Sequence, residues 1–375
     1  MIVVGGGVIG LTAAWRLAQR DLSVALLERG EPGSGTSHVA AGMLAPIAEA
    51  DLGEEPVLRL GLAAAAAYQS FVAELHQASG IDPGYTPCGA LLVARDRDEA
   101  EALDRELRVR GRLGLPVARL RSQQARELEP ALAPTLRLAL DVPDDHAIDP
   151  RRLVAALAQA LVHAGGRLCP GTEVAALSVE QGAVDGVTLS DGSRVNAPQV
   201  VVAAGPWSGE LAGLPEHARV PVRPIKGQIL RLHDPAGPGL LTRVLRMRPG
   251  YVVPRGDGRY VIGGTMEERG FDDTVTAGGV FEMLRDAIEL VPGLSELVID
   301  ELSAGMRPGT PDNAPLIGAG ALPGLQWATG HYRNGILLAP VTAELIVASV
   351  LGCAPESAAP FAPARFAPSP AGVRA

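Results

Sequence analysis

The 375 residues exceed one ordinary domain, and the 47% hydrophobic and 20% charged content is typical of a globular protein with a substantial core. The formal net charge of −9 argues against a general nucleic-acid binder, because such proteins need basic surfaces to displace counterions. The three cysteines, Cys88, Cys169 and Cys353, are widely separated. They form no CxxC pair, so we expect neither a disulfide framework nor a metal site.

The sequence favours a cytoplasmic protein. Met1 leads directly into an apolar stretch and glycines, without the basic segment or cleavage site of a secretory signal. The most apolar late stretch, residues 335–353, is interrupted by Pro340 and Glu344 and favours a buried helix over a membrane span. We therefore expect no integral membrane segment, while peripheral membrane contact stays open. The oligomeric state is open too, a homo-oligomer included.

The first third of the chain alternates strands with helices. Apolar residues recur at helical spacing between residues 9 and 20, and short apolar runs flank them on both sides. In chain order we expect a strand at 2–4, a helix at 9–20, a strand at 23–27, a loop leading into a short helix at 33–46, a helix at 57–79, a strand at 88–94 and a charged helix at 98–112.

The middle of the chain opens with a capped helix. Asp149 as N-cap and Pro150 as first helical residue predict its start, and Gly165 its end. Further strands are expected at 174–179, 183–189, 194–195 and 200–203. Between residues 220 and 306 the pattern changes to alternating strands, such as 228–232, 251–254 and 260–263, broken by a helix near 280–290. A helix at 335–351 closes the fold, and the Pro/Ala-rich tail beyond it is expected to be disordered.

This order of elements predicts an α/β fold. A Rossmann-like nucleotide-binding domain would draw on both ends of the chain, and a second, mainly antiparallel β-sheet domain would hold the substrate. We assign residues 1–80, 145–215 and 310–352 to the first domain, 81–144 and 216–309 to the second, and 353–375 to a disordered tail.

A glycine-rich turn between the first strand and helix predicts a dinucleotide site. Gly5 permits a tight turn, Gly7 lets the backbone approach a pyrophosphate, and Gly10 lets helix and strand pack closely. Glu28 ends the next strand and suits a ribose hydroxyl. Arg29 could bind a 2′-phosphate, but Glu28 at the ribose position weighs against NADP.

Two further segments favour FAD over NAD. Thr36 and Ser37 precede the small residues 40–42, so an extended cofactor could lie against the backbone and bond to these hydroxyls. Residues 329–337 form a polar glycine loop that feeds the last helix, whose positive N-terminal end would stabilise negative charge on a reduced flavin. Each segment alone could be an ordinary surface loop or turn.

The chain resembles the glycine oxidases of thiamine biosynthesis, within the D-amino-acid oxidase family. The resemblance extends from residue 2 to about residue 351, and the last two of its motifs are quite specific. It is carried by residues 3–10 (VVGGGVIG), 41–44 (AGML), 306–310 (MRPGT) and 331–340 (HYRNGILLAP).

This resemblance implies noncovalent FAD. A covalent flavin would require a cysteine near the end of the substrate segment, and residues 311–315 contain none. With the glycine turn, the expected cofactor contacts are Val8, Ile9, Glu28, Arg29, Thr36, Ser37, Ala41, Gly42, Met43, Val174, Gly205, His331, Tyr332, Arg333, Asn334, Gly335, Ile336 and Leu337.

Two arginines in uncharged, glycine-rich surroundings are candidates for holding a substrate carboxylate, because a planar guanidinium binds it at two points. The resemblance implies that Arg307 is the anchor and that Arg333 is a second substrate contact or a flavin neighbour. Tyr251 would assist carboxylate binding, and Met266 would line the pocket. Without the resemblance, Tyr251 and Met266 could be ordinary core residues.

His331 is not expected to act as a general base. Hydride loss from an amine's α-carbon needs a neutral amine and an electron-accepting flavin, and proximity and electrostatics can supply most of the effect. We therefore expect oxidation of a small amino acid, with dioxygen as acceptor, to a 2-oxo acid, ammonia and hydrogen peroxide. The alternatives are a sarcosine oxidase, a D-amino-acid dehydrogenase with another acceptor, and a flavoprotein subunit without activity.

Overall fold

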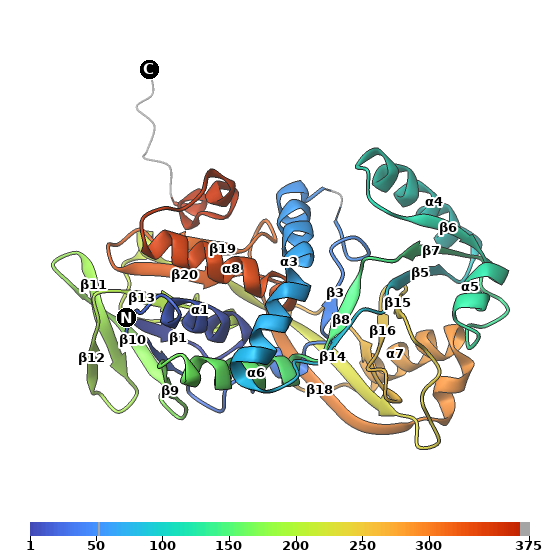
Figure 1. Cartoon of the computed structure of the whole chain (residues 1–375), viewed down its shortest axis with the longest axis horizontal. Helices are drawn as coiled ribbons and strands as arrows, with labels where there is room; N and C mark the ends of the chain where they lie inside the picture. The colour runs from blue at the N-terminus through green and yellow to red at the C-terminus, as the bar shows by residue number, and fades with distance from the viewer. Residues whose placement is uncertain (52, 368–375) are drawn as a thin grey trace.

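The computed structural model describes residues 1–51 and 53–367, organised around a six-stranded and an eight-stranded sheet (Figure 1). The six-stranded sheet has the order β19-β20-β13-β1-β2-β9 and is parallel except for the β19–β20 pair. Its strands are β1 (Ile2–Val4), β2 (Ala25–Leu27), β9 (Arg167–Cys169), β13 (Val200–Val202), β19 (Leu316–Ala319) and β20 (Leu325–Thr329).

Helices and a small sheet pack around this parallel sheet. One apolar core joins β1 to α1 (Val8–Ala18), α3 (Glu55–Ser79), α6 (Pro150–His163) and α8 (Gly335–Val350). A second core joins the sheet to the antiparallel β10 (Val174–Glu180), β11 (Ala183–Leu189) and β12 (Arg194–Asn196). The Asp149 side chain accepts a hydrogen bond from Arg151 N at 2.9 Å, so the predicted cap of α6 is present.

The eight-stranded sheet has the order β18-β14-β17-β16-β15-β5-β7-β6 and is antiparallel except for the β15–β5 pair. Its strands are β5 (Ala90–Ala94), β6 (Ala118–Arg121), β7 (Leu138–Val142), β14 (Arg223–His233), β15 (Val244–Arg246), β16 (Tyr251–Pro254), β17 (Arg259–Gly263) and β18 (Val298–Gly309). The helices α4 (Arg97–Arg112), α5 (Ser122–Leu128) and α7 (Ala277–Leu290) accompany it (Figure 1).

Short elements connect the two regions. The strands β3 (Met43–Leu44), β4 (Tyr85–Thr86) and β8 (His146–Ile148) form another small sheet, and α2 (Thr36–Val39) contacts β18. Single 3₁₀ turns occupy Gly205–Trp207 (η1), Glu216–Ala218 (η2) and Pro292–Glu296 (η3). Within the residues that the structure describes, no helix is both long and apolar enough to span a bilayer.

The prediction of a disordered tail is wrong for residues 353–367. Two 3₁₀ helices, η4 (Glu356–Phe361) and η5 (Pro363–Phe366), follow α8. Phe361 is buried in the first apolar core, and Arg365 Nε lies 2.8 Å from Asp312 Oδ2. Composition suggested disorder, but one aromatic anchor and one ion pair fix this segment. The rest of the predicted tail, residues 368–375, lies outside the described residues, and the division into two discontinuous domains stays a prediction.

Candidate active site

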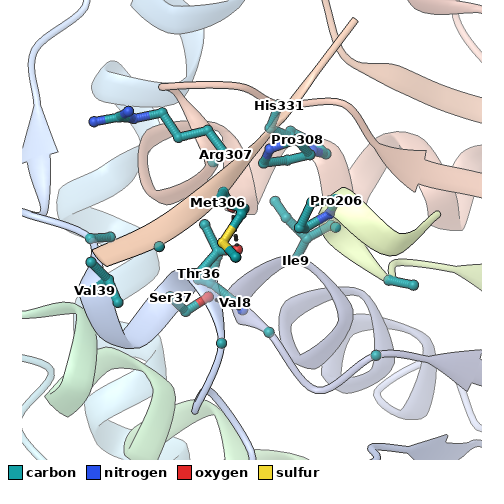
Figure 2. Close-up of a pocket in the computed structure, with 18 of the residues that line it drawn as sticks. Val8, Ile9, Thr36, Ser37, Val39, Pro206, Met306, Arg307, Pro308 and His331 are labelled. Carbon is teal, nitrogen blue, oxygen red and sulfur yellow. Dashed lines mark hydrogen bonds between the residues drawn. The ribbon is translucent and has the colours of Figure 1, made fainter. Parts of the chain in front are cut away.

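One cavity of about 640 Å³ extends from the glycine turn after β1 to the ends of β16 and β18. Figure 2 shows Val8 and Ile9 on one side, and Met306, Arg307 and Pro308 of β18 on another. The structure therefore brings the expected dinucleotide turn and the expected substrate residues to a single cavity.

The three glycines of the turn have distinct roles. Gly5 has a φ of +104°, and a Cβ there would lie 2.5 Å from the Ala203 carbonyl oxygen. A Cβ on Gly10 would overlap the Gly5 carbonyl oxygen, so this glycine lets α1 pack closely on the turn. Gly7 precedes α1 and lines the cavity, so the helix N-terminus is placed to receive a phosphate.

Glu28 and Arg29 line the cavity beyond the glycine turn. The Glu28 carboxylate accepts hydrogen bonds from Gly6 N at 2.6 Å and from Gly30 N at 2.9 Å, which fixes its direction. The Arg29 guanidinium carbon lies 3.8 Å from the centre of the Trp207 ring, a cation–π contact. Trp207 also lines the cavity, and our interpretation of the sequence missed it.

The two hydroxyls expected to face the cofactor already have protein partners. Thr36 Oγ1 donates to Met306 O at 2.7 Å, joining α2 to β18 as the dashed line in Figure 2 shows. Ser37 Oγ accepts from Val8 N at 3.0 Å and keeps its own proton to donate. Both residues line the cavity, so they shape its wall and also connect elements around it.

Small and apolar residues complete the cofactor end of the cavity wall. Gly42 has a φ of +79° and Gly205 a φ of +55°, conformations that favour glycine at both positions. A side chain on Gly42 would overlap the Ile148 carbonyl oxygen, so the loop can lie against β8 only with glycine there. The lining residues of this stretch are Ala41, Gly42, Met43, Val174 and Gly205.

The loop before α8 lines the cavity with residues 331–336. His331 is fully buried, and its Nε2 lies 2.9 Å from Thr342 Oγ1. Burial lowers the pKa of His331 to about 3, so the ring is neutral near pH 7 and supports the loop. Leu337, also expected at the cofactor, lies in the apolar core and lines a small neighbouring cavity.

Arg307 and Tyr251 lie side by side at the sheet end of the cavity. A Cβ on Gly264 would lie 3.1 Å from Arg307 Nη2 and 3.2 Å from Tyr251 Oη, so one point touches both groups. Arg307 Nη1 donates to Thr265 O at 3.0 Å. Burial raises the pKa of Tyr251 and the nearby Arg307 charge opposes this rise, so the phenol stays protonated and can donate to a carboxylate.

Two glycines make room for these side chains. A Cβ on Gly227 of β14 would overlap the Arg307 guanidinium, and one on Gly263 of β17 would overlap the Tyr251 ring hydroxyl. The guanidinium and the phenol therefore lie directly against strand backbone.

The structure separates the other two expected substrate residues. Arg333 lines the cavity, with its guanidinium carbon 5.3 Å from the Tyr332 ring centre. Its buried Nε has no hydrogen-bond partner among the described residues. Met266 is 60% exposed and lies outside the cavity, because the chain after β17 turns toward β14, where Glu267 pairs with Lys226. Its Sδ contacts the Tyr332 hydroxyl at 3.2 Å.

Glu49 also lines the cavity and was not predicted. Its carboxylate forms an ion pair with Arg246 of β15, which lies 197 residues further along the chain. The sequence signal that could have identified Glu49 is that it is the one acidic residue in the otherwise apolar segment 45–50.

A Rossmann-like sheet and a glycine turn at one end of a cavity, with the Arg307–Tyr251 pair at the other, are typical of dinucleotide-dependent enzymes. The chain belongs to the family of FAD dependent oxidoreductases, whose model matches residues 1–349. The cavity fits FAD, because it joins the residues expected to bind ribose and pyrophosphate to the α8 N-terminus without interruption.

Named relatives agree with this assignment. The chain is 38% identical to the bifunctional protein ThiO/ThiG of Synechocystis sp., over 98% of this chain and 54% of that protein. It is 36% identical to a glycine oxidase of Geobacillus kaustophilus, over 92% of this chain and 90% of that protein. The crystal structure of glycine oxidase from the same organism superposes with a TM-score of 0.89 and 35% identity, over 96% of this chain and 97% of that one.

The chain spans about half the length of the bifunctional relatives that it matches. The predicted fold class, the resemblance to this family and FAD as cofactor are confirmed. The roles of the individual site residues stay predictions.

Proposed function

We propose that the chain oxidises glycine and other small amines or D-amino acids to a 2-oxo acid, ammonia and hydrogen peroxide, and that it serves thiazole formation in thiamine biosynthesis. The observation that carries the proposal is the Arg307–Tyr251 pair, which faces the same cavity as the glycine turn. A protein that only stores a flavin has no need of a carboxylate-binding pair. The thiamine role rests on the resemblance to the glycine oxidases of that pathway.

The chemistry divides between cofactor and protein. Bound FAD supplies the acceptor for the hydride that leaves the substrate α-carbon. The protein binds and orients: Arg307 offers two donors to the carboxylate, and the Tyr251 hydroxyl offers a third. The imine product then hydrolyses in water to the oxo acid and ammonia. His331 moves no proton, because its buried ring is neutral and bonded to Thr342.

Small substrates suit this arrangement. The carboxylate anchor lies deep in the cavity, where Tyr251 is half-buried and Arg307 rests on strand backbone. A short amino acid held there has its α-carbon at a fixed position relative to the carboxylate anchor. Orientation of this kind can supply much of the rate enhancement. We further propose dioxygen as electron acceptor and a cytoplasmic location.

The test is a substrate panel on the purified holoprotein. Glycine, sarcosine and D-alanine are each added without oxygen, and the visible absorption band of the flavin is followed. We expect glycine to bleach the band, and readmitted oxygen to restore it with release of one peroxide per cycle. Bleaching without peroxide identifies a dehydrogenase with another acceptor, and faster bleaching by sarcosine than by glycine identifies a sarcosine oxidase. If none of the three amines bleaches the band, the proposal is wrong and the chain is a flavoprotein subunit without activity.

A further inference from the structure

Glu49 is an acidic residue of the cavity wall, in the turn that follows β3. Its side chain is 12% exposed and that of its partner Arg246 is 20% exposed. It lines both the large cavity and the small neighbouring one, together with Arg333. A carboxylate so far removed from water is costly unless it is paired, and the Arg246 guanidinium supplies that pairing.

The turn that carries Glu49 is fixed from behind by two buried charged residues. Asp145 accepts hydrogen bonds from Ile47 N at 3.2 Å and from Ala48 N at 2.6 Å. Arg110 Nε donates to Ile47 O at 3.2 Å. Asp145 is 0% exposed and Arg110 is 1% exposed. Three hydrogen bonds thus hold this short turn, and the ion pair with Arg246 orients the Glu49 carboxylate.

Glu49 and Arg307 both lie near the Tyr251 side chain in the cavity wall. Arg246 and Tyr251 are directly opposite in the antiparallel β15–β16 pair, so their side chains share one face of the sheet. Glu49 raises the pKa of Tyr251 while Arg307 lowers it, so both charges act on the same phenol. The cavity wall therefore presents a cation, a hydroxyl and an anion near one another.

We propose that Glu49 binds the amino end of the substrate and thereby selects amino acids over other small carboxylic acids. The amino group of the substrate donates hydrogen bonds both as an ammonium and in the neutral form that hydride loss requires, and the Glu49 carboxylate can accept them from either. Arg246 keeps the Glu49 carboxylate oriented and leaves it an oxygen for the substrate. A buried group that must hydrogen-bond its ligand discriminates strongly against ligands that lack the partner. The inference rests on the proposed function, because it concerns the substrate of that reaction.

The experiment compares two ligands that differ in one group. Glycine carries the amino group, and acetate has the same carboxylate without it. Glu49→Gln is expected to raise the Kd of glycine, measured from the concentration dependence of anaerobic flavin reduction, by about tenfold or more. The inhibition constant of acetate against glycine oxidation should change by less than about twofold. Glu54→Gln is the matched control, because Glu54 lines only the small cavity, and it should alter neither constant.

Equal weakening of glycine and acetate by Glu49→Gln, or no weakening of glycine, would overturn the inference. Flavin content and the thermal midpoint show whether the variant folds. If Glu49→Gln does not fold, Glu49→Asp keeps the charge on a shorter side chain and should still weaken glycine binding more than acetate binding. An equal change in the glycine Kd and the acetate inhibition constant would contradict the inference. A wild-type protein that oxidises no amine instead refutes the proposed function, so the two failures are distinguishable.

Discussion

The two ends of the cavity differ in the groups that form their walls. At the glycine turn the backbone of Gly5 and Gly7 lines the wall, and the Glu28 carboxylate there is held by two main-chain N–H groups. At the sheet end the wall is a row of charged and polar side chains, with Arg307, Tyr251 and Glu49 from three distant parts of the chain. Backbone suits a cofactor that is bound at all times, while side chains suit a small substrate that must be recognised and released.

Glycine serves opposite purposes at these two ends. Gly5 and Gly10 allow one backbone segment to approach another. Gly227 and Gly263 allow a side chain to lie on a strand. Substitutions at the first pair should therefore affect folding and cofactor binding, and substitutions at the second pair should affect catalysis.

The largest effect is expected from Gly10→Ala. The new methyl group would overlap the Gly5 carbonyl oxygen, so α1 must move away from β1. Overpacking of this kind costs about 2 to 3 kcal/mol, and here it also displaces the phosphate-binding helix end. We expect loss of nearly all FAD, measured as the ratio of flavin to protein absorbance, and a lower thermal midpoint.

Gly7→Ala is the matched comparison. Its Cβ would lie 3.4 Å from Ser37 Oγ, an ordinary contact distance, but it would point into the cavity. The apoprotein should keep its thermal midpoint while FAD affinity falls. If Gly7→Ala unfolds the apoprotein as much as Gly10→Ala does, the separate roles given to these glycines are wrong.

The second effect is expected at the sheet end, from Arg307→Met. Removal of the guanidinium that is proposed to hold the substrate carboxylate should lower kcat/KM for glycine by about a thousandfold. FAD content should stay near that of the wild type, because the cofactor end is untouched. Steady-state kinetics and flavin absorbance measure the two quantities.

Arg307→Lys tests the geometry of the interaction as well as its charge. An ammonium keeps the positive charge but cannot make the two-point contact, so most of the loss should remain. Recovery of near wild-type activity in the lysine variant would mean that charge alone holds the substrate.

The cofactor end was predicted from the sequence because its signals are local. A strand, three spaced glycines, a helix and an acidic residue lie within the first 28 residues, and each has a known mechanical role. The capped helix α6 was equally predictable, since Asp149 and Pro150 are adjacent.

The substrate end could not be predicted in the same way. Arg307 and Tyr251 were selected by resemblance, and nothing local shows that a lone tyrosine faces a lone arginine. The Glu49–Arg246 pair joins residues 197 positions apart, through the three-residue strand β15 that has no clear pattern of its own. Met266 was misplaced because the turn after β17 is set by pairing between Glu267 and Lys226, a contact that spacing does not encode.

A smaller effect is expected from Gly227→Ala, which sharpens the comparison with Gly10→Ala. The methyl group would displace the Arg307 guanidinium, a flexible group that can move without unfolding the sheet. Misplacement by about 1 Å can cost roughly 10- to 100-fold in rate, so kcat/KM should fall within that range. FAD content and the thermal midpoint should hold.

Gly278→Ala provides the control for Gly227→Ala. A Cβ there meets no atom within 4 Å, so kinetics and stability should both be unchanged. If Gly227→Ala leaves kcat/KM intact, Arg307 does not depend on close packing against β14.

The smallest effect concerns pH and the loop before α8, where both ends of the cavity meet. Burial lowers the pKa of His331 from 6.5 to about 3, so below pH 6.5 the unfolded chain binds a proton that the folded chain does not. The free energy of unfolding is therefore unaffected by this residue above pH 6.5 and falls as the pH drops toward 3, by about 2 kcal/mol between pH 7 and pH 5.

Urea unfolding with saturating FAD at both pH values should show this loss in the wild type and a smaller one in His331→Gln. The exposed His217→Gln should keep the full loss. An identical pH dependence in wild type and His331→Gln would show that His331 is not held neutral by the fold.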